Sequence, residues 1–321
     1  MPRKAKQPES RATSDRAPAA SERGKRRDTS DEPRVTEPMS DQIIRVFVRR
    51  TKWTPDDALT WVGEPPLPGI LPEKLPVRIS VVFSWDVSRA VDLLKVWEKR
   101  YHDVRIGGPA YSSPCPDFVP GRYIKHGVTF TSRGCPKRCP WCLVHWGEGP
   151  LRELDPIMPG HIVQDNNLFA CSREHFLRVC DMLRTQRAIQ FKGGIDIDYL
   201  TAWHVDQMKS LRIDELWVAC DRDQDLVRLD KAADLLADWP QEKKRCYALG
   251  GFEGDTPAAA HRRCEMIYEK GFLPFAQYYK PPEAERWLPW GEWSAWWRKW
   301  ARPAAYRKAA NERRVTNDER R

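Results

Sequence analysis

The sequence has no long apolar run. None of its 321 residues belongs to a stretch of the roughly 18 apolar residues that a membrane-spanning helix needs. The opening Met-Pro-Arg-Lys leads into polar residues instead of the apolar core of a secretory signal. These absences predict a cytoplasmic protein with no membrane partner, in which the nine cysteines are reduced.

Large apolar residues are almost missing from residues 1–40, which are rich in Pro, Ser and charged side chains. Such a segment cannot bury enough surface to offset its ordering entropy, so we predict a disordered tail. It carries ten basic and seven acidic residues, and residues 298–321 carry nine basic and three acidic residues. The net charge of +9 therefore belongs to the two ends. Basic ends indicate nucleic acid as a candidate partner, with solubilising disorder as the alternative for residues 1–40.

Residues 41–125 have the pattern of a small α/β layer. Apolar runs at 43–48, 77–83 and 104–110 predict strands, and 87–101 place apolar residues on one helical face. The strand–helix–strand order predicts a Rossmann-like domain.

Residues 126–282 repeat a strand–helix unit. Six strands and about five such units predict a partial (βα)6 barrel, with its chemistry at the C-terminal ends of the strands. We expect strands at 128–132, 161–164, 188–192, 215–220, 245–250 and 273–279, and helices at 172–185, 200–211, 226–239 and 256–270.

A cysteine motif directly follows the first of these strands. Cys135, Cys139 and Cys142 are spaced Cys-x3-Cys-x2-Cys, and thiolates are the normal ligands of iron–sulfur clusters. Three protein ligands on a [4Fe–4S] cluster leave one iron open for chemistry. The alternative is a zinc site, for which His145 would supply the fourth ligand.

The motif resembles that of the radical S-adenosylmethionine (SAM) superfamily, in which an aromatic residue precedes the last cysteine; here it is Trp141. The resemblance covers about residues 43–282. It implies that the open iron binds SAM and that one electron, supplied by a flavodoxin- or ferredoxin-type donor, cleaves SAM to a 5′-deoxyadenosyl radical. That radical would abstract hydrogen from a substrate, for which a nucleobase or nucleic acid is the first candidate. The alternative function is a non-catalytic zinc or iron–sulfur protein that binds nucleic acid.

The resemblance also implies SAM-binding residues at the strand ends. The family's Gly-Gly-Glu-like element is missing after the second strand, where Asp165 or Asn166 would accept from the SAM ammonium unless they form an Asx turn. Trp141 would pack near the adenine. Further candidates, each of which also fits a plain turn, cap or surface ion pair, are Gly193, Gly194, Asp221, Arg222, Gly250, Gly251 and Glu253. The sequence indicates no catalytic residue beyond these.

Residues 83–86 and 106–110 are similar to the cobalamin-binding domain that precedes many radical SAM barrels. The Asp-x-His-x-x-Gly loop that ligates cobalt is absent between residues 41 and 125, where His102 is the only histidine. Cobalamin is therefore not expected as a cofactor.

Residues 283–321 combine a tryptophan-rich segment with a basic tail. Six tryptophans between Trp287 and Trp300 are spaced for one side of a helix. Burial against the rest of the protein is favoured, because large aromatics are costly to leave in water. The alternative is that these rings stack on bases while Arg298, Lys299 and Arg302 meet phosphates.

The six other cysteines lack ligand spacing and are expected to be free thiols: Cys115, Cys171, Cys180, Cys220, Cys246 and Cys264.

Overall fold

The computed structural model describes residues 42–111, 118, 121–281 and 289–301. The predicted tail at 1–40, the basic residues from Arg302 onward, and Cys115 and Trp287 lie outside this part of the chain. The described residues form two parallel sheets with helices, and a small antiparallel pair of strands. The predicted α/β class is confirmed at this level.

The first sheet has four parallel strands in the order β2-β1-β3-β4. They are β1 (Ile44–Phe47), β2 (Thr60–Val62), β3 (Val77–Ser80) and β4 (Val104–Gly107). Helix α1 (Val87–Glu98) connects β3 to β4 and buries Ala90, Leu93 and Trp97 on one face. The predicted strand–helix–strand order is confirmed. Strand β2 was not predicted, because it is only three residues long and shows no alternating pattern.

The second sheet has six strands, all parallel, and their order in space is the order of the chain. The strands are β5 (Val128–Thr129), β8 (Ile162–Val163), β9 (Ile189–Ile195), β10 (Ile213–Ala219), β11 (Lys244–Gly250) and β12 (Leu273–Tyr278). Such an order needs a crossover after each strand, and helices provide four of them. These are α3 (Arg173–Arg184), α4 (Ala202–Met208), α5 (Leu226–Leu235) and α6 (Pro257–Glu269).

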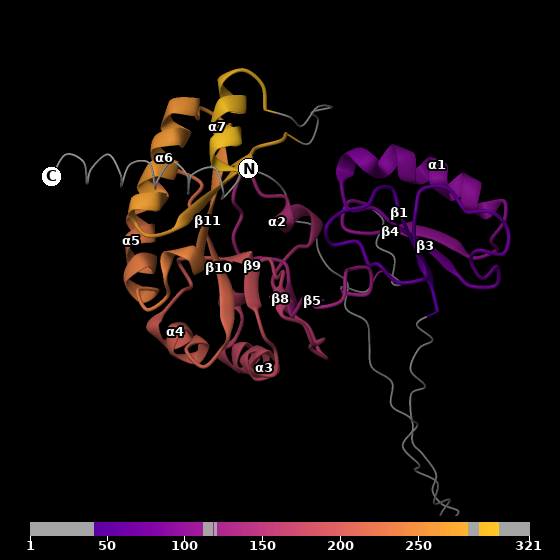
Figure 1. Ribbon diagram of the computed structural model, residues 1–321, viewed down its shortest axis with the longest axis horizontal. Coiled ribbons are helices and arrows are strands. Elements are labelled where there is room, and N and C mark those ends of the chain that lie inside the picture. The colour runs from indigo at the N-terminus through magenta and orange to yellow at the C-terminus, as the bar shows by residue number, and fades with distance from the viewer. Residues whose placement is uncertain (1–41, 112–117, 119–120, 282–288, 302–321) are drawn as a thin grey trace, which may run out of the picture. The chain divides into compact units, whose positions relative to one another are not determined.

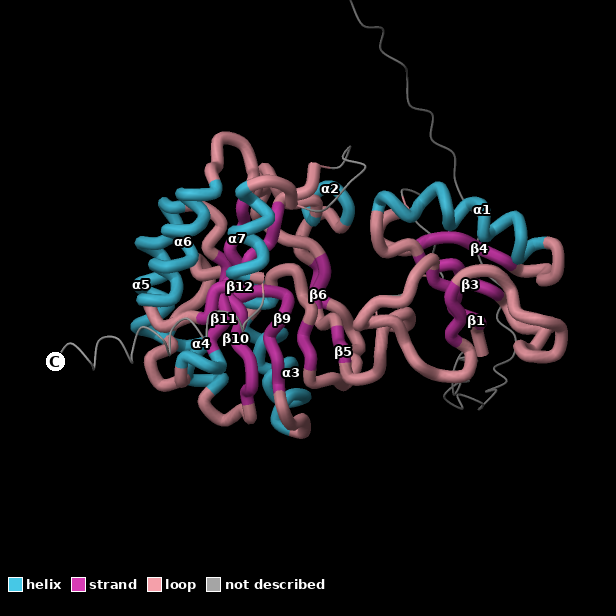
Figure 2. Tube along the Cα trace, turned by 45° about the horizontal axis from the view of Figure 1, so that its top comes forward, coloured by secondary structure: helices cyan, strands magenta, loops and turns pink. Residues whose placement is uncertain are grey.

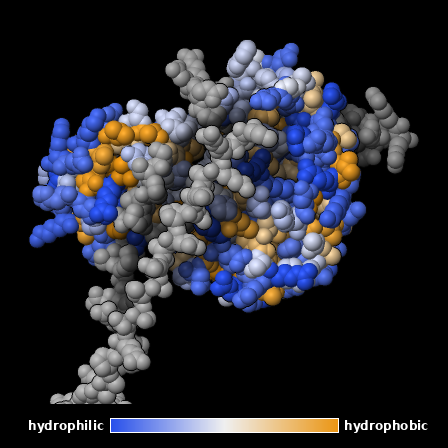
Figure 3. Space-filling model, turned by 180° about the vertical axis from the view of Figure 1, so that it is seen from behind, coloured by the Kyte–Doolittle hydropathy of each residue, from blue (hydrophilic) through white to orange (hydrophobic). Residues whose placement is uncertain are grey.

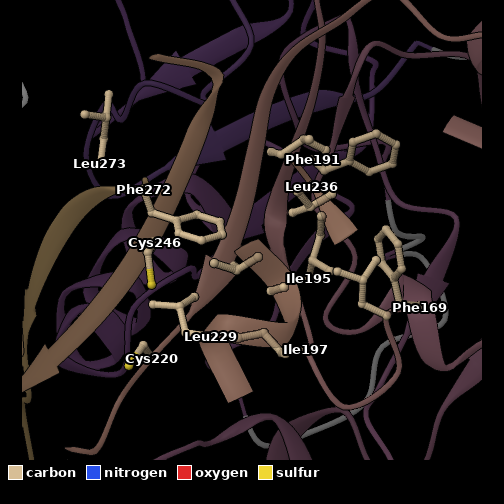
Figure 4. Packing of buried hydrophobic residues seen from close by; sticks show 14 of the residues in the cluster. Phe169, Phe191, Ile195, Ile197, Cys220, Leu229, Leu236, Cys246, Phe272 and Leu273 are labelled. Atoms are coloured by element: carbon tan, nitrogen blue, oxygen red, sulfur yellow. The ribbon is translucent and has the colours of Figure 1, made fainter. Parts of the chain in front are cut away.

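The four crossover helices cover one face of this sheet (Figure 1). Their apolar stripes and alternate strand residues form one hydrophobic core. Figure 4 shows Leu229 and Leu236 of the α5 region together with Phe191 and Ile195 of β9 and the thiol of Cys246. The helix starts are locally encoded, because Ser172 and Thr256 accept from the backbone N–H groups of His175 and Ala259 as N-caps.

The predicted strand at 128–132 is wrong in its second half. The chain leaves the large sheet after Thr129, and Ser132–Arg133 (β6) pairs antiparallel with Arg152–Glu153 (β7). The physical cause is Thr131, whose backbone and hydroxyl both donate to the buried carboxylate of Asp165. That bond turns the chain away from the parallel ladder at the point where the cysteine loop begins.

Figure 2 shows α7 (Glu292–Trp300) as a further helix beside β12 and α6, against which it packs. In the described residues every helix falls short of the length and apolarity needed to cross a bilayer. On the face shown in Figure 3, hydrophilic residues predominate and hydrophobic ones occur in small groups.

Candidate functional site

The three motif cysteines lie in one loop that the β6–β7 pair closes at its base. The Cys135 N–H donates to the carbonyl of Gly149 at 3.3 Å, and the Cys142 N–H donates to the carbonyl of Cys139 at 3.0 Å. Gly134 has a φ of +81°, and a Cβ there would collide with the carbonyl of Pro150. Only glycine permits this close approach, so the loop conformation is built into the residue before the first cysteine.

The three thiols are half-buried and near enough to influence one another's charge. Burial raises the pKa of the Cys139 thiol, and the neighbouring Cys142 raises it further. Burial also raises the pKa of the Cys142 thiol, as does the proximity of Cys135. In the described part of the chain, no three His, Cys, Asp or Glu side chains lie close enough to hold one metal ion together. A [4Fe–4S] cubane makes a different demand, since each thiolate binds its own iron.

The sulfur of Cys135 accepts two N–H groups. One is the backbone N–H of Lys137, and the other is the side-chain amide of Asn167, each at 3.4 Å. Asn167 is 2 % exposed, and its amide also donates to Asp196 at 3.0 Å. Its side-chain oxygen, Oδ1, is buried and accepts no hydrogen bond from any of the described residues. The sequence offered no signal for Asn167, because only the fold brings the end of β8 to the first cysteine.

Asp165 and Asn166 are both brought to the start of the cysteine loop. The Asp165 carboxylate is 2 % exposed and accepts the Thr131 N–H, the Thr131 hydroxyl and, at 3.0 Å, the Ser132 hydroxyl. The side-chain oxygen of Asn166 accepts the Gly134 N–H at 3.0 Å. Both residues therefore hold the loop. The side-chain oxygens of Asp165 and Asn166 are used by N–H and hydroxyl groups of the cysteine loop. Among residues 165–167, it is Asn167 that keeps a side-chain acceptor without a donor.

A charged network fixes the middle of the loop. The ammonium group of Lys137 lies 2.6 Å from carboxylate oxygens of both Asp196 and Asp198, just after β9. Arg228 of α5 pairs with Asp198 at 2.7 Å. These partners raise the pKa of Lys137 against the opposing effect of burial, so the ammonium form is retained. The segment between the first two cysteines is thus anchored to the ends of two neighbouring units of the sheet.

The fold brings together Trp141, Asp221 and Arg222, three of the SAM-binding candidates predicted from the sequence. The Trp141 indole N–H donates to the Asp221 carboxylate at 3.1 Å, and the Arg222 guanidinium lies 4.8 Å from the indole centroid. Burial, with the nearby Asp225, raises the pKa of Asp221 to about 6. Asp225 itself accepts the N–H groups of Asp221 and Arg222 at 3.0 and 2.9 Å, which orients this strand end.

Three of the four candidate glycines have no room for a side chain, and the fourth has open space. At Gly193 a Cβ would collide with the backbone carbonyl of Asp165, and at Gly250 it would lie 2.5 Å from the Trp296 ring. Their lack of a side chain is thus explained by packing. Gly194 faces open space, whereas Gly251 lies against Tyr278. Glu253 is exposed in the turn that follows them.

A cavity of about 380 Å³ opens beside the cysteine loop. Trp141 and Leu143 of the loop form one side of it, and β12 and α7 form others. Its walls are mostly aromatic and aliphatic: Trp141, Leu143, Leu249, Phe275, Ala276, Gln277, Tyr278, Tyr279, Lys280, Trp297 and Ala301. The volume and lining suit a flat, largely apolar group of nucleoside size.

His145, the candidate fourth zinc ligand, and the buried thiols of the large sheet form no metal-binding group among the described residues. His145 lies on the short helix α2 (Val144–Gly147) with its ring 5.0 Å from that of Trp146. Cys220, Cys246 and Cys264 are fully buried in the core of the large sheet, and burial raises the pKa of each thiol. All eight cysteines in the described residues are free thiols.

No family model and no curated protein sequence matches this chain. One solved structure that is similar to it is the radical SAM methyltransferase TsrM from Kitasatospora setae, with cobalamin and a [4Fe–4S] cluster bound. The match covers 63% of this chain and 63% of that one, at 10% sequence identity and a TM-score of 0.48. The expectation that cobalamin is absent as a cofactor is opposed by this finding. That expectation is therefore withdrawn.

Proposed function

We propose that the protein is a radical SAM enzyme whose [4Fe–4S] cluster is held by Cys135, Cys139 and Cys142. The proposal rests on one observation: three mutually close thiols occupy a single prefolded loop, and the first sulfur already accepts two N–H groups. Such donors are typical of cluster ligands. When bound, the cluster supplies the electron that cleaves SAM to methionine and a 5′-deoxyadenosyl radical. We further propose that the six-stranded sheet is the partial (βα)6 barrel of this superfamily.

The residues around the loop fit a SAM molecule. We assign the buried, unpartnered side-chain oxygen of Asn167, Oδ1, to the SAM ammonium, since an amide oxygen can accept from it. Asp221 is assigned to the ribose hydroxyls and Arg222 to the carboxylate. The adenosyl group is assigned to the cavity beside Trp141. Asp165 and Asn166 are reassigned from SAM binding to support of the loop.

Anaerobic reconstitution with iron and sulfide tests this function. We expect a brown protein that forms 5′-deoxyadenosine from SAM with dithionite. Replacing Cys135, Cys139 or Cys142 by Ala should abolish this product, whereas Cys180→Ala, at a buried position on α3, should retain it. A colourless protein with one zinc per chain and no SAM cleavage would instead support the alternative function, a zinc protein that binds nucleic acid.

We also propose an electron donor and a substrate for this enzyme. A flavodoxin- or ferredoxin-type protein would replace dithionite, and a nucleobase or nucleic acid is proposed as substrate because both ends of the chain are basic. The electron donor is tested by turnover with a flavodoxin or ferredoxin in place of dithionite. The substrate is tested by adding RNA, which should stimulate 5′-deoxyadenosine formation by the full chain and not by a chain truncated at residue 301. The cluster requires reduced thiols, in keeping with the expected cytoplasmic location.

A further inference from the structure

Helix α7 is seated on the large sheet by its tryptophans. Trp296 and Trp300 are 3 % and 4 % exposed, and Trp293 packs on Tyr278 of β12 at 5.5 Å between ring centroids. Gly250 at the end of β11 leaves room for this contact, because a Cβ there would lie 2.5 Å from Trp296 and 2.9 Å from Trp293. The favoured prediction of burial is therefore confirmed for Trp296 and Trp300.

Polar contacts with α6 fix the end of the same helix. The Trp300 indole N–H donates to Nδ1 of His261 at 3.1 Å. Lys299 Nζ lies 3.0 Å from Nε2 of the same imidazole, and Glu265 lies 3.2 Å from it. A directional bond to a buried indole specifies one orientation of the helix, which burial of apolar surface alone does not.

Trp297 differs from its neighbours. It is half-buried and lines the cavity beside the cysteine loop, together with Ala301 from the next turn. Trp141, the aromatic residue of the cysteine motif, lines the same cavity. A planar ligand in this space would therefore meet an indole from the loop and another from α7.

We propose that α7 is a wall of the nucleoside pocket and that Trp297 contacts the purine ring of SAM. The inference rests on the proposed function and adds to it a binding residue from the C-terminal segment. A purine gains by contact with an indole face because both are flat and polarisable, and loss of one such contact to alanine typically weakens binding about 10-fold or more. The seating of Trp293, Trp296 and Trp300 holds Trp297 in place before the ligand arrives.

The probe is 5′-methylthioadenosine, which has the adenosyl group but lacks the amino acid part that would bind the open iron. Its affinity for the full chain is measured by equilibrium dialysis, with and without reconstituted cluster. We expect Trp297→Ala to weaken binding about 10-fold and Trp297→Phe to restore most of it. Trp290→Ala is the matched control, since Trp290 is 79 % exposed and precedes the helix. Ala301→Phe adds a ring to the cavity and removes no core side chain, and it should block binding of the probe.

The outcomes separate this inference from the proposed function. Equal affinity of wild type, Trp297→Ala and Ala301→Phe would overturn the role of α7 while leaving SAM chemistry intact. SAM cleavage by a wild type that does not bind the probe would overturn the assignment of the cavity and, with it, the role of α7. A wild type that neither binds the probe nor cleaves SAM refutes both. Thermal melting of each variant confirms that the affinity is measured on folded protein.

Discussion

The side-chain amide of Asn167 donates a hydrogen bond to the sulfur of Cys135 across 3.4 Å. A donor to a cluster sulfur stabilises the reduced cluster, which carries more negative charge. We therefore expect Asn167→Leu to shift the cluster's reduction potential to a more negative value and to weaken iron retention about 10-fold or more. A redox titration followed by electron paramagnetic resonance measures the first effect, and competition with a chelator measures the second.

Asn166→Ala is the matched control for this change. It removes the bond to the Gly134 N–H but keeps both donors to the Cys135 sulfur. Its potential should equal that of the wild type. A potential unchanged in Asn167→Leu would show that the amide has no influence on the cluster.

Asp165→Ala should destabilise the protein strongly. The buried carboxylate accepts three hydrogen bonds from Thr131 and Ser132, and its removal leaves those donors without partners in a dry site. Three buried donors left without an acceptor predict a decrease of about 3 kcal/mol or more in the free energy of unfolding. Urea denaturation of the apoprotein measures it. Asp181→Ala, at an exposed position on α3, should change it by less than about 0.5 kcal/mol. A small effect at Asp165 would return that residue to the SAM-binding candidates.

Gly193→Ala tests the packing of β9 against the end of β8. The added methyl group would collide with the Asp165 carbonyl, a backbone atom that cannot rotate away. We expect poor folding or a loss of about 3 kcal/mol, in the range of overpacked cores. Gly147→Ala is the control, because its methyl group would meet no atom closer than 4.0 Å. Normal stability of Gly193→Ala in circular dichroism melts would contradict the close approach.

His204 should make the protein sensitive to acid. It is 8 % exposed among Phe169, Phe176 and Trp203, and burial, with the nearby Arg173, lowers its pKa to about 4. As the pH falls, the unfolded state therefore binds the proton before the folded state does. The contribution of neutral His204 to the free energy of unfolding is fully present above pH 6.5 and is lost as the pH falls toward 4. The shift corresponds to about 3 kcal/mol once the pH is below the folded pKa.

The measurement is the free energy of unfolding of wild type and His204→Gln from pH 7.5 to 4. Other acidic groups titrate in both proteins, so the difference between the two curves isolates this imidazole. We expect that difference to narrow as the pH falls. Parallel curves would show that His204 does not resist protonation in the folded state.

Much of the fold was predictable because its signals are local. The alternation of β-branched runs with amphipathic helices located β9 to β12 and the helices between them within a few residues, and Ser172 and Thr256 marked helix starts. The short strands β2 and β7 carry no such pattern. The break after Thr129 was missed because its cause is a contact with Asp165, distant in the sequence.

The candidate site was predictable only where a motif defines it. The cysteine spacing and the position of Trp141 are properties of the sequence, and the partnership of Trp141 with Asp221 agrees with strand ends meeting at one edge. Asn167 and Trp297 were missed as site residues, since an amide in a turn and one tryptophan among six carry no distinguishing signal. Their proposed roles depend on which atoms the fold leaves unpaired or facing a cavity.

The strands of the large sheet follow one another in space as they do in the chain, so the parts of the site are synthesised in their order across the sheet. The loop with the three cysteines and its supports, Asp165, Asn167 and Asp196, all emerge from the ribosome within the first two-thirds of the chain. Their contacts span neighbouring units and can form early. Helix α7 comes about a hundred residues later. In the nascent chain, the proposed cluster site would thus be formed before α7 completes the proposed nucleoside cavity.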